Sequence, residues 1–444
     1  ANFTHRGLPR IIDQLHHAAA ASSLKLVDYS NNKLTYFPSN LGQLPKLQQL
    51  DLTYNLIHQL PADLKDFQAL ERLNLHQNSL DSIPSAIQGL KKLQELNINS
   101  NQLKHFPIAL TQLPALEQLN LGSNQLKNLP DAVANMIALK KLDLSVNPFY
   151  KIPAIITKIP HLEHLDFSST KLLFIPAFIK NMPKVKILDL MDNQLKTLPP
   201  ELFEIESLEN LDLMDNEIEQ VSDHLGKLSQ LTDLDLSFNK ITILPSSIGQ
   251  LKKLKFLDLR SNPLSALPDE IGQLKRLEAF YLYSNNIQEL PESFAQLKQL
   301  KYVTLSNNSM QQLPAVVSHW SRLEQLDLSY NQITNLAPNF KQLKKLQQLK
   351  LQENKLTQFP LVLIKCTALK QLNLGSNQIK SIPKDISKLQ QLTHLDLSFN
   401  KITSIPIEIT KLKKLSRLLL NFNPIPKEAI EALRKKMPYT EIVF

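Results

Sequence analysis

Apolar residues recur along almost the whole chain with one fixed spacing. The segments LQQLDLTYNLIHQLPADLKDFQA (47–69) and LTDLDLSFNKITILPSSIGQLKK (231–253) align without a gap and follow the 23-residue template LxxLxLxxNxLxxLPxxLxxLxx. Seventeen consecutive units of this template run from Leu24 to Lys414 with no insertion or deletion, and an eighteenth begins at Leu415. Such a period is the sequence signature of a repeat protein, in which neighbouring units share one core.

The spacing inside the template predicts two kinds of element. The leucines at positions 4 and 6 are two residues apart, so they face one side of a β-strand, and positions 3, 5 and 7 face the other side. The LPxxLxxL half spaces its apolar residues by three, which indicates a short helical turn with proline at its first position. One unit cannot bury its own leucines, so we expect the units to stack with their strands in a parallel sheet.

Position 9 of the template is asparagine in 17 of the 18 units, and Thr170 is the exception. A tight buried turn leaves backbone N–H and C=O groups without partners, and a side-chain amide can both donate to them and accept from them. We therefore expect these asparagines to be buried and structural, with the hydroxyl of Thr170 as a partial substitute.

These motifs resemble those of the leucine-rich repeat family, and the 23-residue period is similar to that of its bacterial members. The resemblance covers nearly the whole chain. It implies an α/β leucine-rich repeat solenoid, a curved horseshoe with a parallel β-sheet on the concave face and short helical or extended segments on the convex face.

Both ends of the chain depart from the template. Residues 1–23 lack it, and their apolar residues fall at helical spacing, so we expect an N-terminal capping helix before the seventeen repeats of residues 24–414. Residues 415–444 are expected to form the final repeat and a cap, with a helix from Pro426 to about Lys436 and a last strand after Pro438. The start at Ala1 is compatible with a removed leader, so cytoplasmic and secreted locations both stay open.

Composition argues against most chemistries. The chain has 8 glycines and no GxGxxG or GxxxxGK[ST] string, which argues against a Gly-rich phosphate loop. Its one cysteine, Cys366, excludes an intrachain disulfide and stands in a leucine column, where a buried and unreactive side chain is expected. No apolar run reaches the ~18 residues of a membrane span. We expect no cofactor and no metal.

One set of residues invites a catalytic interpretation. His164, Asp166 and Ser168 share a strand face, as do their counterparts in the last full repeat. Neighbours on one face of a strand are roughly 6.5–7 Å apart, so His and Ser would not touch directly. We therefore predict that the protein is not an enzyme and that its function lies on the exposed faces of the repeats.

The concave face carries an acidic run. Position 5 is aspartate in six consecutive repeats from Asp143 to Asp258, and residues 185–238 hold 13 acidic and 3 basic side chains. Aspartate is also common at this position of the template, so the run can be explained structurally, without any binding role. The local excess of negative charge favours a cation or a basic partner.

Aromatic residues lie beside the acidic run, at positions predicted to face outward. Aromatic side chains without a core to fill are typical of protein interfaces. We therefore predict that the concave face of repeats 8–13 (residues 185–322) binds a protein partner, for which the acidic run favours a basic character. The sequence leaves the oligomeric state open and favours a monomer. The predicted contact residues are Asp189, Asp212, Asp235, Asp258, Phe256, Tyr281, Tyr283 and Tyr302.

A second interpretation rests on the basic half of the chain. Residues 231–444 have 29 basic and 17 acidic side chains, and many of the lysines fall just before a strand, where they would line one rim. The alternative function is therefore a bacterial secreted or surface protein, similar to an adhesin, that binds host or polyanionic ligands through this rim. Binding of nucleic acid is not expected, because no aromatic residues interleave with the rim and the concave face is acidic.

Overall fold

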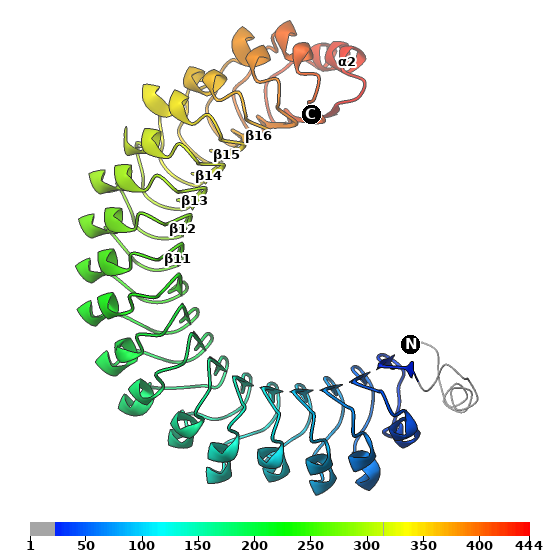
Figure 1. Ribbon diagram of the computed structural model, residues 1–444. Coiled ribbons are helices and arrows are strands. Elements are labelled where there is room, and N and C mark those ends of the chain that lie inside the picture. Colours follow the sequence, from blue (N-terminus) through cyan, green and yellow to red (C-terminus); the bar gives the residue numbers. More distant parts are fainter. Residues whose placement is uncertain (1–22, 314) are drawn as a thin grey trace. The chain divides into compact units, whose positions relative to one another are not determined.

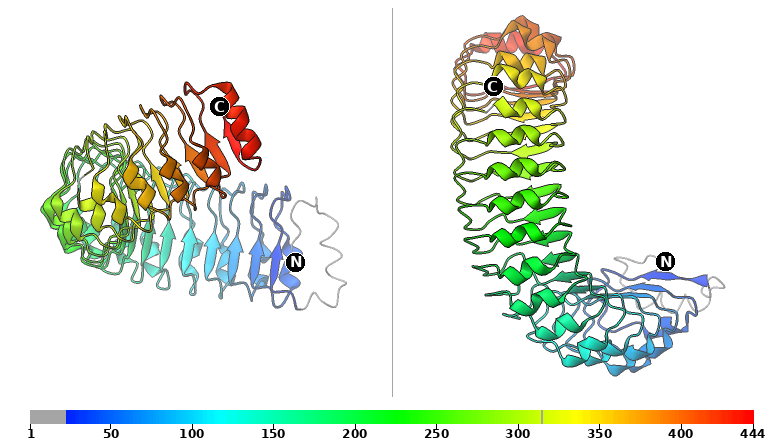
Figure 2. Two further views of the ribbon diagram at one scale, coloured as in Figure 1. Left: turned by 90° about the horizontal axis from the view of Figure 1, so that it is seen from above. Right: turned by 60° about the vertical axis from the view of Figure 1, so that its left-hand side comes forward.

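The computed structural model describes residues 23–313 and 315–444 (Figure 1), and the predicted N-terminal capping helix lies outside them. The chain divides into two compact units, residues 1–217 (unit 1) and 218–444 (unit 2). Within each unit the strands line the inner side of a curve, and short 3₁₀ helices line the outer side (Figures 1 and 2). We call these sides the inner and outer faces.

The described part of unit 1, residues 23–217, contains nine parallel strands of three residues each, and β1 to β8 each pair with the next strand along the chain. The strands are β1 (Leu26–Asp28), β2 (Gln49–Asp51), β3 (Arg72–Asn74), β4 (Glu95–Asn97), β5 (Gln118–Asn120), β6 (Lys141–Asp143), β7 (His164–Asp166), β8 (Ile187–Asp189) and β9 (Asn210–Asp212). The 3₁₀ helices between them are η2 (Ser39–Gln43), η3 (Ala62–Asp66), η4 (Ser85–Gly89), η5 (Ile108–Gln112), η6 (Asp131–Asn135), η7 (Ala154–Lys158), η8 (Ala177–Asn181) and η9 (Pro200–Glu204).

Unit 2 repeats this arrangement and ends differently. Its strands are β10 (Asp233–Asp235), β11 (Phe256–Asp258), β12 (Ala279–Tyr281), β13 (Tyr302–Thr304), β14 (Gln325–Asp327), β15 (Gln348–Lys350), β16 (Gln371–Asn373), β17 (His394–Asp396), β18 (Arg417–Leu419) and β19 (Glu441–Val443). Its helices are η10 (Asp223–Lys227), η11 (Ser246–Gln250), η12 (Asp269–Gln273), η13 (Glu292–Gln296), η14 (Ala315–His319), η15 (Pro338–Gln342), η16 (Leu361–Lys365), η17 (Lys384–Lys388), η18 (Ile407–Lys411) and α2 (Lys427–Lys436).

The register confirms the predicted parallel solenoid. Within each unit, the residues of neighbouring strands up to β18 pair 23 positions apart, as Leu50 does with Leu73 and Leu234 with Leu257. Between β18 and β19 the offset is 24. The middle residue of each strand, a leucine in most of them, points into the core, where Leu50 is 2% exposed. Full burial of one such side chain stabilises the fold by about 1.5–3 kcal/mol, and the repeated pattern makes this contribution in every unit.

A template proline precedes most of the outer-face turns that the structure describes. In η3 the carbonyl of Pro61 accepts from Leu64 N, and the carbonyl of Leu64 accepts from Phe67 N at 3.2 Å. Proline suits this place because it lacks the N–H that the turn would leave without a partner. Where Ser222 replaces the proline, its hydroxyl oxygen accepts from His224 N at 3.2 Å and caps η10 instead.

The position-9 asparagines form the ladder that the sequence predicts. In a central example, Asn147 Nδ2 donates to Leu121 O at 3.0 Å and to Leu144 O at 3.1 Å, while its Oδ1 accepts from Leu126 N at 2.9 Å. The same bonds recur in both units. All of these asparagines are buried except Asn423, which is half-buried and lies in the last repeat.

Thr170 takes over part of this role. Its side chain is buried, and its hydroxyl donates to Phe167 O at 2.7 Å, as an asparagine amide would. It has no second oxygen to accept from the preceding turn, and Tyr150 N instead bonds to the backbone oxygen of Thr170 at 3.0 Å. Tyr150 and Lys171 both adopt positive φ in the turns next to Thr170.

Two further details concern single positions in unit 2. The Cys366 side chain is buried, and burial raises the pKa of its thiol to about 11, which agrees with the expected unreactive position. At the end of the chain, β19 pairs in parallel with β18, and Arg434 on α2 donates to Ile442 O at 3.0 Å. The division of the chain into repeats and two caps stays a prediction.

Candidate binding surface

The position-5 aspartates have a structural role, which is one of the two interpretations that the sequence left open. Asp235 Oδ1 accepts from Ser237 N at 2.8 Å and from Ser237 Oγ at 2.6 Å, and Asp143 accepts from Ser145 in the same way. The carboxylate thus satisfies the first N–H beyond the strand. The recurring sequence LDLS was the available signal, because Asp and Ser two residues apart are typical partners in such local bonds.

In unit 1 the predicted site residues Asp189 and Asp212 lie opposite each other on β8 and β9, and both are half-buried. Each accepts from the N–H two residues later, at 2.9 Å from Met191 and from Met214 respectively. Burial raises the pKa of Asp189 to about 7. The hydrogen bond from Met191 N lowers this pKa, whereas the negative charges of Asp166 and Asp212 raise it further. The negative charge of Asp189 is therefore partly lost near neutral pH.

In unit 2 Asp235 and Asp258 are opposite each other on β10 and β11, but they differ in exposure. Asp235 is half-buried, whereas Asp258 is 0% exposed. Arg260 Nε donates to Asp258 Oδ1 at 2.8 Å and lies 2.6 Å from Oδ2. Burial raises the pKa of Asp258 to about 6, although the Arg260 hydrogen bond acts in the opposite direction. Asp258 is therefore placed to hold Arg260 rather than to touch a partner.

Arg260 is surrounded by aromatic rings. Its guanidinium carbon lies 6.0 Å from the ring centre of Phe238, 5.8 Å from that of Tyr281 and 5.5 Å from that of Tyr283. Phe256 lies against Tyr281, with ring centres 5.4 Å apart. These contacts bring the predicted residues Phe256, Tyr281 and Tyr283 of two neighbouring repeats together with Phe238 of a third around a cation, which stabilises their arrangement.

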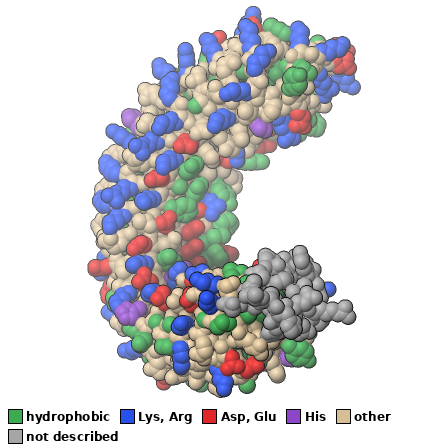
Figure 3. Space-filling view, turned by 45° about the vertical axis from the view of Figure 1, so that its right-hand side comes forward, with side chains coloured by type: hydrophobic (Ala, Val, Ile, Leu, Met, Phe, Trp, Pro, Cys, Tyr) green, Lys and Arg blue, Asp and Glu red, His purple; other side chains and the backbone are tan. Residues whose placement is uncertain are grey.

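Arg260 was not among the residues predicted from the sequence, although its template position carried a signal. Position 7 carries a serine, threonine, glycine or other uncharged residue in most repeats, and Arg260 is the one Lys or Arg among them. Tyr302 lies on β13 opposite Ala279 of β12 and is half-buried. We call Arg260 with Phe238, Phe256, Tyr281 and Tyr283 the aromatic cluster. Hydrophobic side chains gather with acidic ones on the inner face (Figure 3).

The lysine rim also forms in unit 2. Its side chains are exposed, and several bond to glutamines of a neighbouring repeat: Lys252 Nζ donates to Gln273 Oε1 at 2.6 Å, and Lys414 Nζ to Gln391 Oε1 at 2.6 Å. Because these partners are neutral, the positive charge of the rim is not cancelled by them. The rim comprises Lys252, Lys253, Lys275, Arg276, Lys298, Lys344, Lys345, Lys413 and Lys414.

The structure does not assemble a catalytic triad from His164, Asp166 and Ser168. Ser168 Oγ donates to Asp166 Oδ1 at 2.7 Å, so the hydroxyl serves the strand end rather than the imidazole. No group of three or more potential metal ligands occurs in residues 23–313 and 315–444. In this same part of the chain, no helix combines the length and apolar character needed to cross a bilayer.

Comparison with family models identifies the repeats. A model described as leucine-rich repeat region matches residues 242–358, and one described as leucine rich repeat matches residues 61–103, 206–264 and 367–425. The chain belongs to the leucine-rich repeat family. Comparison with curated protein sequences gives no match.

Solved leucine-rich repeat structures agree with this assignment. A leucine-rich repeat protein of Leptospira interrogans is 34% identical, with a TM-score of 0.75 and coverage of 98% of this chain and 99% of the other. The Arabidopsis receptor kinase HAESA, solved with the peptide hormone IDA and a co-receptor, is 31% identical, with a TM-score of 0.72 and coverage of 92% and 72%. An internalin of Listeria monocytogenes shares the fold at 21% identity, with a TM-score of 0.54 and coverage of 80% and 88%.

Proposed function

We propose that this leucine-rich repeat protein is a non-enzymatic protein–protein interaction scaffold whose partner binds the concave face of repeats 8–13. The observation that carries the proposal is the aromatic cluster of unit 2. Its rings are only half-buried, or exposed in the case of Phe238, and they fill no core. Aromatic and arginine side chains held in fixed positions are the residues that contribute most of the binding energy in protein interfaces.

The acidic residues supply a second part of the proposed surface. In unit 2, half-buried Asp235 lies beside the cluster, and in unit 1, Asp189 and Asp212 present carboxylates on the same face of their repeats. Such charges attract a basic partner during its approach and raise the association rate more than the final affinity. Asp258 has an indirect part, because it fixes the guanidinium against which the rings pack.

Two neighbouring structures support a binding role of this kind. HAESA is described in complex with a peptide hormone, and another plant receptor, RGFR1, in complex with the peptide RGF2. These descriptions concern those proteins. They support the view that this fold can bind polypeptide ligands.

The test is a comparison of two variants against a partner isolated with the wild-type chain. Tyr281→Ala with Tyr283→Ala should raise the partner's Kd by about 30-fold, which corresponds to about 2 kcal/mol lost at a hot spot. The control is Tyr439→Ala, since this tyrosine of unit 2 is 95% exposed and lies outside the cluster. Unchanged affinity of the double variant for every wild-type partner would refute the proposed surface.

The alternative is binding of polyanionic ligands through the lysine rim, in a secreted or surface protein similar to an adhesin. It is supported by the neutral glutamine partners, which leave the rim's positive charge available. Heparin provides the probe. Binding through the rim should fall steeply between low and moderate salt, because exposed charges are screened over about 10 Å at 0.1 M ionic strength. Loss of heparin binding in Lys252→Gln with Lys275→Gln, with the aromatic variants unaffected, would favour this alternative.

A further inference from the structure

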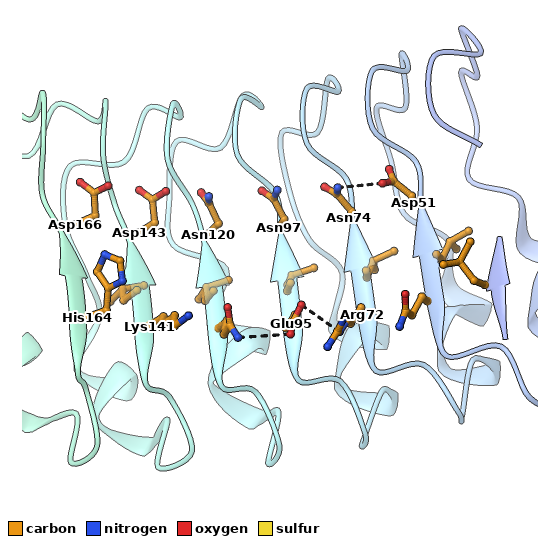
Figure 4. A pocket seen from close by; sticks show the side chains of 18 of the residues that line it. Asp51, Arg72, Asn74, Glu95, Asn97, Asn120, Lys141, Asp143, His164 and Asp166 are labelled. Atoms are coloured by element: carbon orange, nitrogen blue, oxygen red, sulfur yellow. Dashed lines mark hydrogen bonds and ion pairs between the residues drawn. The ribbon is translucent and has the colours of Figure 1, made fainter. Parts of the chain in front are cut away.

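Unit 1 has a groove of a different character from the aromatic cluster of unit 2. The inner face of strands β1 to β7 encloses a hollow of about 540 Å³. Two rows of polar side chains line it (Figure 4). The position-5 row consists of Asp28, Asp51, Asn74, Asn97, Asn120, Asp143 and Asp166, and the position-3 row of Gln49, Arg72, Glu95, Gln118, Lys141 and His164.

The Oδ1 atom of each position-5 side chain accepts a hydrogen bond from a backbone N–H. The second polar atom of the side chain, Nδ2 or Oδ2, is therefore the one that can bind a ligand. Asn97 Oδ1 accepts from Asn99 N at 3.1 Å, and Asn120 Oδ1 accepts from Gly122 N at 3.0 Å. Asp143 and Asp166 use Oδ1 in the same way. With Oδ1 fixed, an asparagine presents the donor Nδ2 to the groove, and an aspartate presents the acceptor Oδ2.

The donors in the middle of the groove are free for a ligand. The Nδ2 groups of Asn97 and Asn120 have no hydrogen-bond partner among the residues that the structure describes, whereas Asn74 Nδ2 donates to Asp51 Oδ2 at 3.3 Å. Each free amide can donate two hydrogen bonds to carbonyl oxygens.

Negative charge is concentrated at the two ends of the position-5 row. Asp28 and Asp51 are adjacent on β1 and β2, and Asp143 and Asp166 are adjacent on β6 and β7. The three strands between them carry the neutral asparagines. In the position-3 row Arg72 and Glu95 pair at 3.2 Å and cancel each other, which leaves the four aspartates in excess over Lys141.

We propose that this groove binds an extended peptide segment that has a pair of basic residues at each end of a neutral stretch. The basic side chains pair with the two aspartate pairs, and backbone carbonyls of the neutral stretch accept from Asn97 and Asn120. This site is separate from the aromatic cluster, and its test does not depend on the partner proposed for unit 2.

The geometry sets the length of the segment. The centres of the two aspartate pairs are five strand spacings apart, about 24 Å at ~4.8 Å per strand. An extended chain rises ~3.3 Å per residue, so about seven residues separate the centres of the two basic pairs, and about five neutral residues lie between them. No Phe, Tyr or Trp is among the lining residues, so the groove lacks the broad aromatic stacking surface that a sugar ring would use.

The experiment measures the fluorescence anisotropy of labelled peptides as the whole chain is titrated into them. The peptides have the form Lys-Lys-(neutral)n-Lys-Lys, and their neutral residues alternate between Ser and Ala. With n of 5 both aspartate pairs are reached. With n of 2 the peptide spans only about 13 Å between centres and engages one pair, so we expect its Kd to be at least about tenfold higher. Affinity that is equal for both spacings would overturn the proposal.

Variants separate specific recognition from general attraction of positive charge. Asn97→Ala with Asn120→Ala should raise the Kd of the five-residue-spacer peptide by about fivefold, the loss expected for two hydrogen bonds. Asn373→Ala is the matched control: the nine residues from Leu119 to Lys127 and from Leu372 to Lys380 differ only at one Leu/Ile position, and Asn373 Oδ1 likewise accepts from the glycine two residues on. It should bind as the wild type does.

Two further results would contradict the inference. Asp51→Asn with Asp143→Asn keeps both Oδ1 anchors and removes two charges, so it should raise the Kd and reduce its salt dependence; an unchanged Kd would exclude the aspartate pairs. Spermine is a flexible tetracation without carbonyl groups. If spermine competes with the peptide as well as unlabelled peptide does, the asparagines make no contribution and the groove is a general cation surface.

Discussion

The inner faces of the two units are built on the same backbone and differ in chemistry. In unit 1 a groove of amides and carboxylates lies over β1 to β7, and in unit 2 an arginine packed among aromatic rings lies over β10 to β12. Both surfaces rest on the same leucine core and the same asparagine ladder. The comparison teaches that positions 3, 5 and 7 can change widely because the fold is held by positions that face the other way.

The strongest test of this view is the asparagine ladder, which both units share. Asn147→Ala in unit 1 and Asn239→Ala in unit 2 should each lower the free energy of unfolding by about 1–3 kcal/mol, because buried backbone groups lose their partners. The measurement is urea denaturation followed by circular dichroism. Tyr281→Ala should change the same quantity by no more than about 0.5 kcal/mol. A larger effect of the tyrosine than of the asparagines would refute the separation of core and surface.

A second prediction concerns the charge pair beneath the aromatic cluster. Arg260→Gln removes the cation from fully buried Asp258 and should destabilise the protein by about 1.5 kcal/mol at pH 8, the lower end for a hydrogen bond to a charged group because Arg260 is partly exposed. The cost should be smaller at pH 5, where Asp258 becomes protonated. Adding Asp258→Asn should recover much of the loss, and its failure to do so would mean that Arg260 acts through the rings alone.

Each unit contains a buried or half-buried aspartate that should make the stability of the protein depend on pH. Burial raises the pKa of Asp189 in unit 1 to about 7 and that of Asp258 in unit 2 to about 6, from ordinary values of 3.8. A raised carboxyl pKa means that the folded state binds the proton more tightly, so stability falls as pH rises from the ordinary pKa to the raised one.

Asp189→Asn should therefore stabilise the protein relative to wild type by an amount that grows between pH 4 and 7, reaching about 1 kcal/mol once solvent screening is allowed for. Thermal unfolding across this pH range provides the measurement. A difference between variant and wild type that stays constant with pH would show that the Asp189 pKa is not raised in the folded protein.

The smallest expected effect is on the chemistry of a single thiol. Cys366 should react slowly with a thiol reagent in the native protein, since burial raises its pKa to about 11, and quickly after unfolding. Because the residue lies in unit 2, Asn239→Ala should accelerate its labelling more than Asn147→Ala does. Fast labelling of the native wild-type protein would contradict a buried position.

The sequence alone predicts the features that depend on period. The 23-residue spacing determines which leucines face inward, and the position-9 asparagine follows from the need to satisfy a buried turn, so the solenoid and its ladder are confirmed by Leu50, Asn147 and their counterparts. The period does not predict which side chains on the inner face contact one another. Arg260 reaches Phe238, Tyr281 and Tyr283 across repeats, and only the spatial positions of those rings reveal the cluster.

The position-5 residues show the same limit in another way. Their sequence indicates an acidic ladder that is available to a partner. In the structure, one carboxylate oxygen of Asp143 and of Asp235 accepts a hydrogen bond from a backbone N–H, and Asp258 is buried. Whether the second atom is a donor or an acceptor becomes meaningful only once the first is anchored. This is why the free amides of Asn97 and Asn120 were not among the predicted site residues.

The unbroken 23-residue register has a consequence for how such a gene can change. Within each unit, residues of neighbouring internal strands pair 23 positions apart, as Leu50 does with Leu73. Every internal repeat therefore contacts the repeat before it and the repeat after it through equivalent surfaces. Excising 69 coding bases joins two surfaces that already fit, whereas removing a single codon shifts every later leucine by one position within its repeat. Recombination between aligned repeats can therefore lengthen or shorten this protein in whole steps, and each step adds or deletes one short strip of the inner face.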